Sequence, residues 1–320
     1  MANLETGSAQ PRDKAVDDQS QRTSSKMSQA VRSAVIFLLV AVLTASAPAL
    51  RARAVNTLTV DDDGVQCTTP FTTISSAVAV ALPGDIIVVC DGLYTEQVTI
   101  NKSLTLQGAA GQTPMVQAPA AMLTSKAIIT VTGSALVSVI IDNLIISGPG
   151  GSSCDSIRSG IRVDTGATAT ITHNLITDIH DTPFGGCQNG IGIIVGSQSD
   201  GTTGMATIND NILQGYQKGG IVVDNAGSSA VITNNVVTGV GRTEIIAQNG
   251  VQVSRGAMVP PSNLQNNTIT GNFYLNRSAS TTPAFATGIL YFQAGDASFA
   301  GPLNSGNKLR HNQVNVSIIP

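Results

Sequence analysis

The chain has 320 residues, of which 42% are hydrophobic, 12% charged and 3% aromatic, and it contains no tryptophan. This composition supports one large apolar core. Residues 55–320 hold 10 basic and 16 acidic residues, and their net charge of −6 argues against nucleic acid as a partner.

Residues 1–54 read as a leader that precedes the folded part. Residues 1–26 are polar, and we expect them to be disordered. An apolar run over residues 34–44 follows, and residues 52–54 (Ala-Arg-Ala) form a cleavage site of the small-x-small type. We therefore predict a signal peptide with Met27 as the true start, and a mature protein without a membrane segment, secreted or held in the periplasm or at the cell surface. An uncleaved membrane anchor is the alternative.

Four cysteines follow the leader: Cys67, Cys90, Cys154 and Cys187. An even number of cysteines in a secreted chain indicates disulfides. Of the three possible pairings we favour Cys67–Cys90 and Cys154–Cys187, because each closes a local loop. A metal site is the weaker alternative, since no two cysteines lie within four residues of each other and the three histidines are scattered.

The folded part begins with a short expected strand at residues 58–60 and an acidic run at 61–63. We interpret this run as a solvated turn rather than a cation site, because calcium loops space their oxygen ligands more widely. Residues 72–82 combine a threonine cap with an apolar stripe and end before Pro83-Gly84, which predicts an α-helix. Such a helix would cover the open end of a stack of strands.

A two-part pattern recurs over residues 160–273. Its first part is a glycine followed by alternating apolar residues, and these glycines lie 30 residues apart: Gly160, Gly190, Gly220 and Gly250. Its second part is an apolar segment, one asparagine and another apolar segment. The asparagines are Asn174, Asn211, Asn235 and Asn267, with weaker copies at Asn143 and Asn312. Period-two alternation indicates three short strands per unit, and a repeat of this length indicates a solenoid.

Stacked units would enclose a core that one unit cannot bury alone. We expect each asparagine to form a corner, because asparagine tolerates positive φ, and its amide to bond the next unit's amide as a ladder. The repeat resembles that of the right-handed parallel β-helix, or pectin-lyase-like, superfamily over about residues 58–318. The resemblance implies an all-β, single-stranded β-helix of about seven rungs, with a short N-terminal capping α-helix.

Residues 83–108 are similar to the opening rung of pectin methylesterases and of NosD-like β-helix proteins. In this rung we expect Glu96 to bond backbone amides near the cap, with a catalytic role as the alternative. The superfamily includes lyases, hydrolases, esterases and adhesins. The residue sets of active pectin methylesterases and polygalacturonases are missing from this sequence, and so is the histidine, cysteine and methionine cluster that copper would need.

Strand alternation places Arg162 and Asp164 on the outer face of the first strand of the unit. By the same count Asp224 lies in the column of Asp164 two rungs later, with Ile194 between them, at about 10 Å. The candidate catalytic residues are Arg162, Asp164, Asp224 and Arg255. The two aspartates are also candidate ligands for calcium, the one cofactor that the sequence leaves open.

A groove on this face would run between two sets of loops, one with Asp178, His180 and Asp181 and the other with Arg255. The preferred function is binding of a cell-surface or extracellular polysaccharide without a standard catalytic site. One alternative is a polysaccharide lyase; a hydrolase is less favoured, because a flat exposed face does little to raise an aspartate pKa. Another is a structural or adhesive protein that self-associates through an uncapped C-terminal edge.

Overall fold

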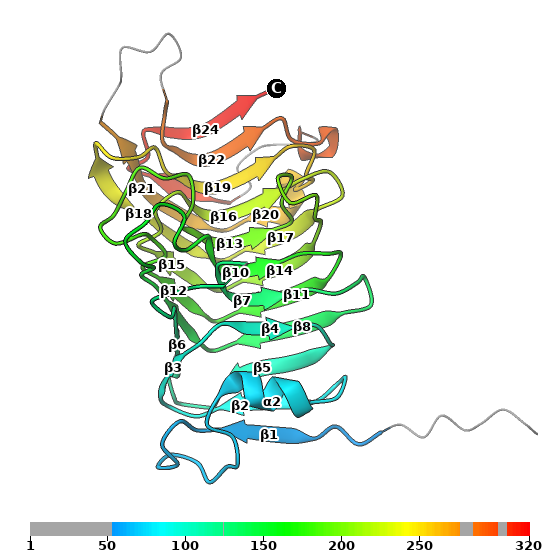
Figure 1. The fold of residues 1–320 in the computed structure, drawn as a ribbon. Helices are drawn as coiled ribbons and strands as arrows, with labels where there is room; N and C mark the ends of the chain where they lie inside the picture. Colours follow the sequence, from blue (N-terminus) through cyan, green and yellow to red (C-terminus); the bar gives the residue numbers. More distant parts are fainter. Residues whose placement is uncertain (1–52, 124, 276–283, 300–305) are drawn as a thin grey trace, which may run out of the picture. The chain divides into compact units, whose positions relative to one another are not determined.

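Three parallel sheets, each of eight strands, enclose one apolar core (Figure 1). The structure, a computed structural model, describes residues 53–123, 125–275, 284–299 and 306–320. Val55–Pro320 forms one compact unit. Nearly all of the expected leader lies outside the described residues, so the signal peptide stays a prediction. Within the described part of the chain, no helix is long and apolar enough to cross a membrane.

The strands of each sheet follow one another along the stack. Sheet A contains β1 (Thr57–Val60), β2 (Ile86–Val89), β5 (Leu104–Gly108), β8 (Ser138–Asp142), β11 (Thr168–Thr172), β14 (Met205–Asn209), β17 (Ser229–Thr233) and β20 (Leu264–Gln265). Sheet B contains β3 (Leu93–Thr95), β6 (Met115–Gln117), β9 (Ile145–Ser147), β12 (Leu175–Thr177), β15 (Ile212–Gln214), β18 (Val236–Thr243), β21 (Thr268–Tyr274) and β23 (Lys308–Arg310).

Sheet C contains β4 (Val98–Ile100), β7 (Ala127–Val131), β10 (Ser159–Val163), β13 (Ile191–Val195), β16 (Gly219–Asp224), β19 (Asn249–Ser254), β22 (Thr287–Phe292) and β24 (Val314–Ile319). Two 3-10 turns, η1 (Pro261–Asn263) and η2 (Asp296–Phe299), lie in connections. Each rung passes through sheets A, B and C in turn. Within the described residues, seven complete rungs run from β2–β3–β4 to β20–β21–β22, which confirms the predicted parallel β-helix.

The helix α2 (Ile74–Val80) packs against β1, β2 and β4 at the N-terminal end of the stack, as predicted. Thr73 caps its first turn. The carboxylate of Glu96 accepts hydrogen bonds from the backbone N–H of Ile74 at 2.7 Å and of Ser75 at 2.9 Å. Lys102 donates to carbonyl oxygens at the other end of the helix. Glu96 therefore has the backbone-capping role that we expected.

An asparagine ladder runs along the corner between sheets A and B. From the second ladder asparagine onward, each Oδ1 atom accepts hydrogen bonds from both the backbone N–H and the Nδ2 of the ladder asparagine one rung before, at 2.9–3.0 Å. All members are buried: Asn174, Asn211, Asn235, Asn267 and Asn307. The ladder is confirmed, and Asn307 extends it by one rung.

Two details of the corner differ from expectation. The residue with positive φ is the one before each ladder asparagine, with φ of 53° to 60° at His173, Asp210, Asn234 and Asn266. The left-handed residue turns the chain, so that the following amide points into the stack. Asn143 and Asn312 are not ladder members: Leu144 holds the ladder position in its rung, and Asn312 bonds Asn272 at another corner.

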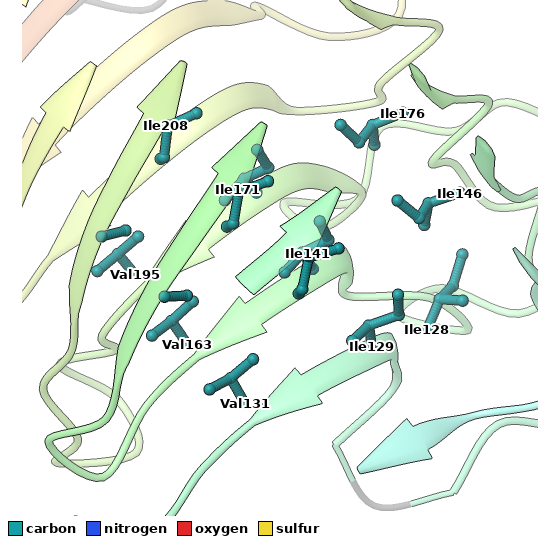
Figure 2. Packing of buried hydrophobic residues seen from close by; sticks show 14 of the residues in the cluster. Ile128, Ile129, Val131, Ile141, Ile146, Val163, Ile171, Ile176, Val195 and Ile208 are labelled. Atoms are coloured by element: carbon teal, nitrogen blue, oxygen red, sulfur yellow. The ribbon is translucent and has the colours of Figure 1, made fainter. Parts of the chain in front are cut away.

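Inward side chains stack in columns along the core (Figure 2). Val131, Val163 and Val195 are paired across β7, β10 and β13, and all are fully buried. A second column in sheet A consists of Ile141, Ile171 and Ile208. Full burial of one such side chain stabilises the fold by about 1.5–3 kcal/mol. Strand alternation therefore separates a dry core from the outer face of each sheet.

The glycines that align at the start of the sheet C strands are Gly160, Gly192, Gly220, Gly250 and Gly288. A Cβ atom added at Gly250 would lie 2.3 Å from Cγ2 of Ile269 and 2.7 Å from the carbonyl oxygen of Gly288. The strands approach too closely here for a side chain. Gly190, which we had placed in this set, instead has a φ of 76° in the turn before β13. The prediction that equivalent glycines recur every 30 residues is therefore wrong.

Both expected disulfides are present, with Cα–Cα distances of 6.3 Å for Cys67–Cys90 and 5.7 Å for Cys154–Cys187. No cysteine is free.

The last strand of sheet C, β24, pairs with β22. Ile318 of β24 pairs with Tyr291, yet Ile318 is 46% exposed and Tyr291 only 1%. Self-association through this edge stays a prediction.

Candidate functional site

Two adjoining hollows lie on the outer face of sheet C. Their volumes are about 350 Å³ and about 230 Å³, and both are lined by Arg158, Gln188, Ile191 and Ile194. The first reaches Arg162, and the second extends over β16 and β19. The hollows therefore follow one another along the stack. This is the face on which the sequence analysis placed a groove.

The floor of the hollows is a column of outward side chains from four successive rungs. Arg162 of β10 pairs with Ile194 of β13, which pairs with Val222 of β16, which pairs with Gln252 of β19. Arg162 thus points outward, as predicted. Strand pairing alone sets this column, because β-strands alternate their side chains between the two faces.

The register corrects one expectation. Asp164 follows Val163 and Asp224 follows Val223, and both valines pair with Val195. Gly196, which follows Val195, therefore separates the two aspartates, and Ile194 does not. The shift of two residues arises because Gly192, rather than Gly190, aligns in this rung. The aspartates do lie two rungs apart in one column.

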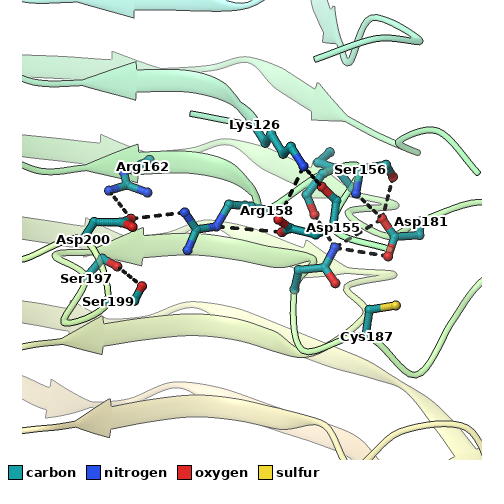
Figure 3. A network of polar contacts seen from close by, with 12 residues as sticks. Lys126, Asp155, Ser156, Arg158, Arg162, Asp181, Cys187, Ser197, Ser199 and Asp200 are labelled. Carbon is teal, nitrogen blue, oxygen red and sulfur yellow. Dashed lines mark hydrogen bonds and ion pairs between the residues drawn. The ribbon is translucent and has the colours of Figure 1, made fainter. Parts of the chain in front are cut away.

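An arginine and aspartate network covers one part of this face, as Figure 3 shows. The Nε atom of Arg162 lies 2.6 Å from Oδ2 of Asp164, and its second guanidinium arm lies 2.8 Å from Oδ2 of Asp200. Arg158 reaches the same Asp200 oxygen at 3.1 Å. Arg162 is 7% exposed, so its positive charge is held between two carboxylates. We had not predicted Asp200, because its loop lies outside the repeat.

The second predicted pair lies further along the same column. Oδ1 of Asp224 accepts hydrogen bonds from Oγ of Ser254 at 2.6 Å and from Arg255 at 2.9 Å. Its Oδ2 accepts the backbone N–H of Gln198 at 2.8 Å. The structure therefore brings Arg162 to Asp164 and Arg255 to Asp224.

Neither aspartate belongs to a group of three histidine, cysteine or carboxylate ligand atoms within 4.8 Å of one another, among the residues described. Such a group does occur at the acidic run, where Asp61, Asp62 and Asp63 meet. There the Asp61 carboxylate already accepts backbone N–H groups, including that of Gly64 at 3.2 Å, as a turn requires. The catalytic and calcium-binding roles of Asp164 and Asp224 stay predictions.

Lys218 is a residue of this face that the sequence analysis missed. It lines the second hollow, directly before β16, and its Nζ donates to the carbonyl oxygen of Ala247 at 2.9 Å. The described residues offer it no carboxylate partner, and burial lowers its pKa to about 8. Ser159 pairs with Ile191, and Ile191 pairs with Gly219 in the next rung. Lys218, the residue before Gly219, therefore occupies the position that Arg158, the residue before Ser159, holds two rungs earlier. That alignment is the signal that could have found it.

Asp181 joins three successive connections between sheets B and C. Its carboxylate accepts hydrogen bonds from the backbone N–H of Ser156 at 2.9 Å and from the side chains of Asn189 and Gln217 at 3.1 Å. Burial raises the pKa of Asp181, but these hydrogen bonds outweigh it and hold the pKa below 3.8. Neither Asp178 nor His180 lines the hollows. Their loop contributes to the site through Asp181, whose hydrogen bonds hold Ser156, Asn189 and Gln217 in place.

The family model for the right handed beta helix region matches residues 124–314. No curated protein matches the sequence.

Among solved structures, the crystal structure of pectate lyase Pel9A is similar, with a TM-score of 0.49 and 13% identity over 83% of this chain and 79% of that one. The pectin methylesterase from Aspergillus niger has a TM-score of 0.41 and 14% identity, over 79% and 91%. The alginate lyase from Paenibacillus sp. str. FPU-7 has a TM-score of 0.39 and 14% identity, over 83% and 99%. These likenesses extend no further than the fold, so no residue role is carried over from them.

Proposed function

Because the chain belongs to the right handed beta helix family, we propose that it binds a linear polysaccharide on the outer face of sheet C. One observation carries the proposal: the two hollows follow each other along the stack and share lining residues, among them Arg158. Rungs repeat every ~4.8 Å, so the face presents similar positions at regular intervals. A polymer with a regular repeat suits such a surface.

The side chains around the hollows suit sugar hydroxyl groups. Arg162, Asp224 and Asn189 are each held by hydrogen bonds or ion pairs to neighbours, so little side-chain freedom remains to be lost on binding. Gln252 adds an amide that bonds Ser254 at 3.1 Å. No aromatic ring lines either hollow in the described chain, so recognition would rest on polar contacts.

The test is binding of purified protein to a panel of neutral and acidic polysaccharides, by affinity electrophoresis and calorimetry. Gln252→Ala and Arg255→Gln alter the second hollow and should weaken binding at least several-fold. Thr207→Ala, on the exposed outer face of sheet A, is the matched control and should leave binding unchanged. If no polysaccharide binds, or if all three variants bind like the wild type, the proposal fails.

A second candidate is cleavage of a uronate polymer by β-elimination. Lys218 favours it, because an amine with a pKa of about 8 is partly neutral at physiological pH and can accept a proton. The amine would take the proton next to the uronate carboxyl group, the glycosidic oxygen would leave with the bonding electrons, and a carbon–carbon double bond would form. Arg162 and Arg255 would stabilise the developing negative charge.

We propose further that the protein acts outside the cytoplasm. Its four cysteines are paired in two disulfides, and such bonds persist mainly in oxidising compartments.

A further inference from the structure

The side chain of Asp200 lies on two guanidinium groups of another rung. Its Oδ2 is 2.8 Å from Arg162 of β10 and 3.1 Å from Arg158, the residue directly before β10, whereas Asp200 belongs to the loop after β13 (Figure 3). Paired arginine donors are the usual partners of carboxylate groups in recognition. One carboxylate oxygen of Asp200 thus contacts both arginines.

Each of the two arginines has a second carboxylate neighbour besides Asp200. Asp164 already bonds Nε of Arg162 at 2.6 Å, and Asp155 lies 3.9 Å from Nε of Arg158. The side chains of Arg158 and Asp200 are 34% and 31% exposed, so solvent and ligands reach their contact. The ion pair between Asp200 and Arg158 is therefore of the exposed kind that contributes little to stability, whereas the ion pair with Arg162 is more buried, because the Arg162 side chain is 7% exposed.

The position of the ion pair relates it to both hollows. Arg158 lines both of them, so its contact with Asp200 lies beside the hollows. Asp200 itself lies at the tip of a short hairpin, which is closed by the two backbone hydrogen bonds between Ser197 and Thr202 at 2.9 and 3.0 Å. The next residue, Gly201, has open space around it. Asp200 can therefore leave the arginines without any movement of the core.

We propose that Arg158 and Arg162 form a binding site for a carboxylate group of the ligand, and that Asp200 occupies this site until the ligand displaces it. The inference rests on the proposed function and names the class of polymer, an acidic one. Lys218 occupies the position of Arg158 two rungs further on, with no carboxylate partner in the described chain, and supplies a cation for another acidic group along the polymer.

The experiment compares oligogalacturonate and oligomannuronate with their uncharged methyl esters by isothermal titration calorimetry. Asp200→Asn removes the competing charge, so it should bind the acids about tenfold more tightly and leave the esters unchanged. Asp210→Asn is the matched control for net charge: Asp210 is exposed and lines neither hollow, so this variant should change acid binding less than twofold. Arg158→Gln in the Asp200→Asn background should cancel the gain.

Equal tightening in both asparagine variants would reduce the effect to net charge and overturn the proposal, as would unchanged or weaker binding by Asp200→Asn. If esters and acids bind every variant equally, polysaccharide binding stands and the carboxylate site fails. If no oligomer binds at all, the proposed function fails. The site is then tested alone, by adding free galacturonate to Asp200→Asn and following the arginine Nε–H signals by NMR; unshifted Arg158 and Arg162 signals would overturn it. Thermal unfolding confirms that each variant is folded.

Discussion

The side chain of Asn235 donates a hydrogen bond to Oδ1 of Asn267 at 3.0 Å, and both amides are fully buried. Asn235 also donates to the carbonyl oxygens of Ile208 and Thr233 at 2.9 Å. Its own Oδ1 accepts two hydrogen bonds from Asn211. One amide therefore satisfies buried polar groups in three rungs.

Replacing Asn235 by leucine should lower the free energy of unfolding by about 1–3 kcal/mol, because buried donors and acceptors lose their partners. Chemical denaturation at neutral pH measures the change. Gln214→Leu removes an amide from the exposed outer face of sheet B and should have little effect. Equal losses in the two variants would contradict a special role for the ladder.

Asp181 should make stability depend on pH in the acidic range. Its pKa in the folded state lies below 3.8, the value of an unperturbed aspartate, so the ionised carboxylate stabilises the fold above about pH 4. This contribution is lost as the pH falls through the lowered pKa. Asp181→Asn should therefore be less stable than the wild type at pH 7, with a smaller difference at pH 3, in urea unfolding. Asp178→Asn removes one carboxylate at an exposed position of the same loop and is the control for the loss of one charge.

The secreted protein should begin near Val55 and contain no free thiol. Mass spectrometry under non-reducing conditions should find the peptide pairs Cys67–Cys90 and Cys154–Cys187. An intact leader, or alkylation of any cysteine without prior reduction, would contradict this prediction.

If the protein cleaves uronates, Lys218→Met should reduce the rate by about 10²–10⁴-fold, the usual contribution of a general base. The rate should rise with pH through about 8, because Lys218 accepts a proton only in its neutral form. The assay follows unsaturated product from polygalacturonate and alginate, with and without calcium.

The double variant Asp164→Ala/Asp224→Ala tests the predicted calcium and catalytic residues in the same assay. Loss of activity that extra calcium partly restores would support them as ligands. Full activity in this variant would exclude both aspartates from the chemistry. No product from the wild type on any uronate would end the lyase hypothesis.

The edge of β24 that faces away from β22 has no strand partner among the described residues and should mediate any self-association. Val314 donates its N–H to the carbonyl oxygen of Ala286, which precedes β22. Successive residues of a strand direct their N–H groups to opposite neighbours, so the N–H of Ser317, three residues after Val314, points away from β22. Ser317→Pro should therefore block edge pairing and leave the bonds to β22 intact. Light scattering should show a monomer for this variant and a larger species for the wild type and for Ser317→Ala. A wild type that stays monomeric at high concentration would contradict the idea.

Much of the fold could be predicted because the core repeats. Alternation identified the inward columns, and the frame around Asn174, Asn211, Asn235 and Asn267 identified the ladder. Asn307 was not predicted as a ladder member, because a long connection precedes it and interrupts the repeat.

The candidate site was less predictable, because its residues come partly from connections that do not repeat. Strand alternation placed Arg162, Asp164 and Asp224 on the outer face, and the structure agrees. Glycines in turns can resemble those of strands, so Gly190 was mistaken for the aligned glycine and the column shifted by two residues. The contact of Asp200 with Arg158 depends on how a loop folds back across a rung, and no local pattern encodes that.

The ladder also bears on how such a chain can lengthen. Each ladder rung presents the same amide donors to one neighbour and the same oxygen acceptor to the other, so the donor side of one ladder rung is complementary to the acceptor side of any other. Duplication of one whole rung in the gene would therefore insert a copy that matches both its neighbours. Each such event would lengthen the protein, and any polymer track on sheet C, by one step of ~4.8 Å.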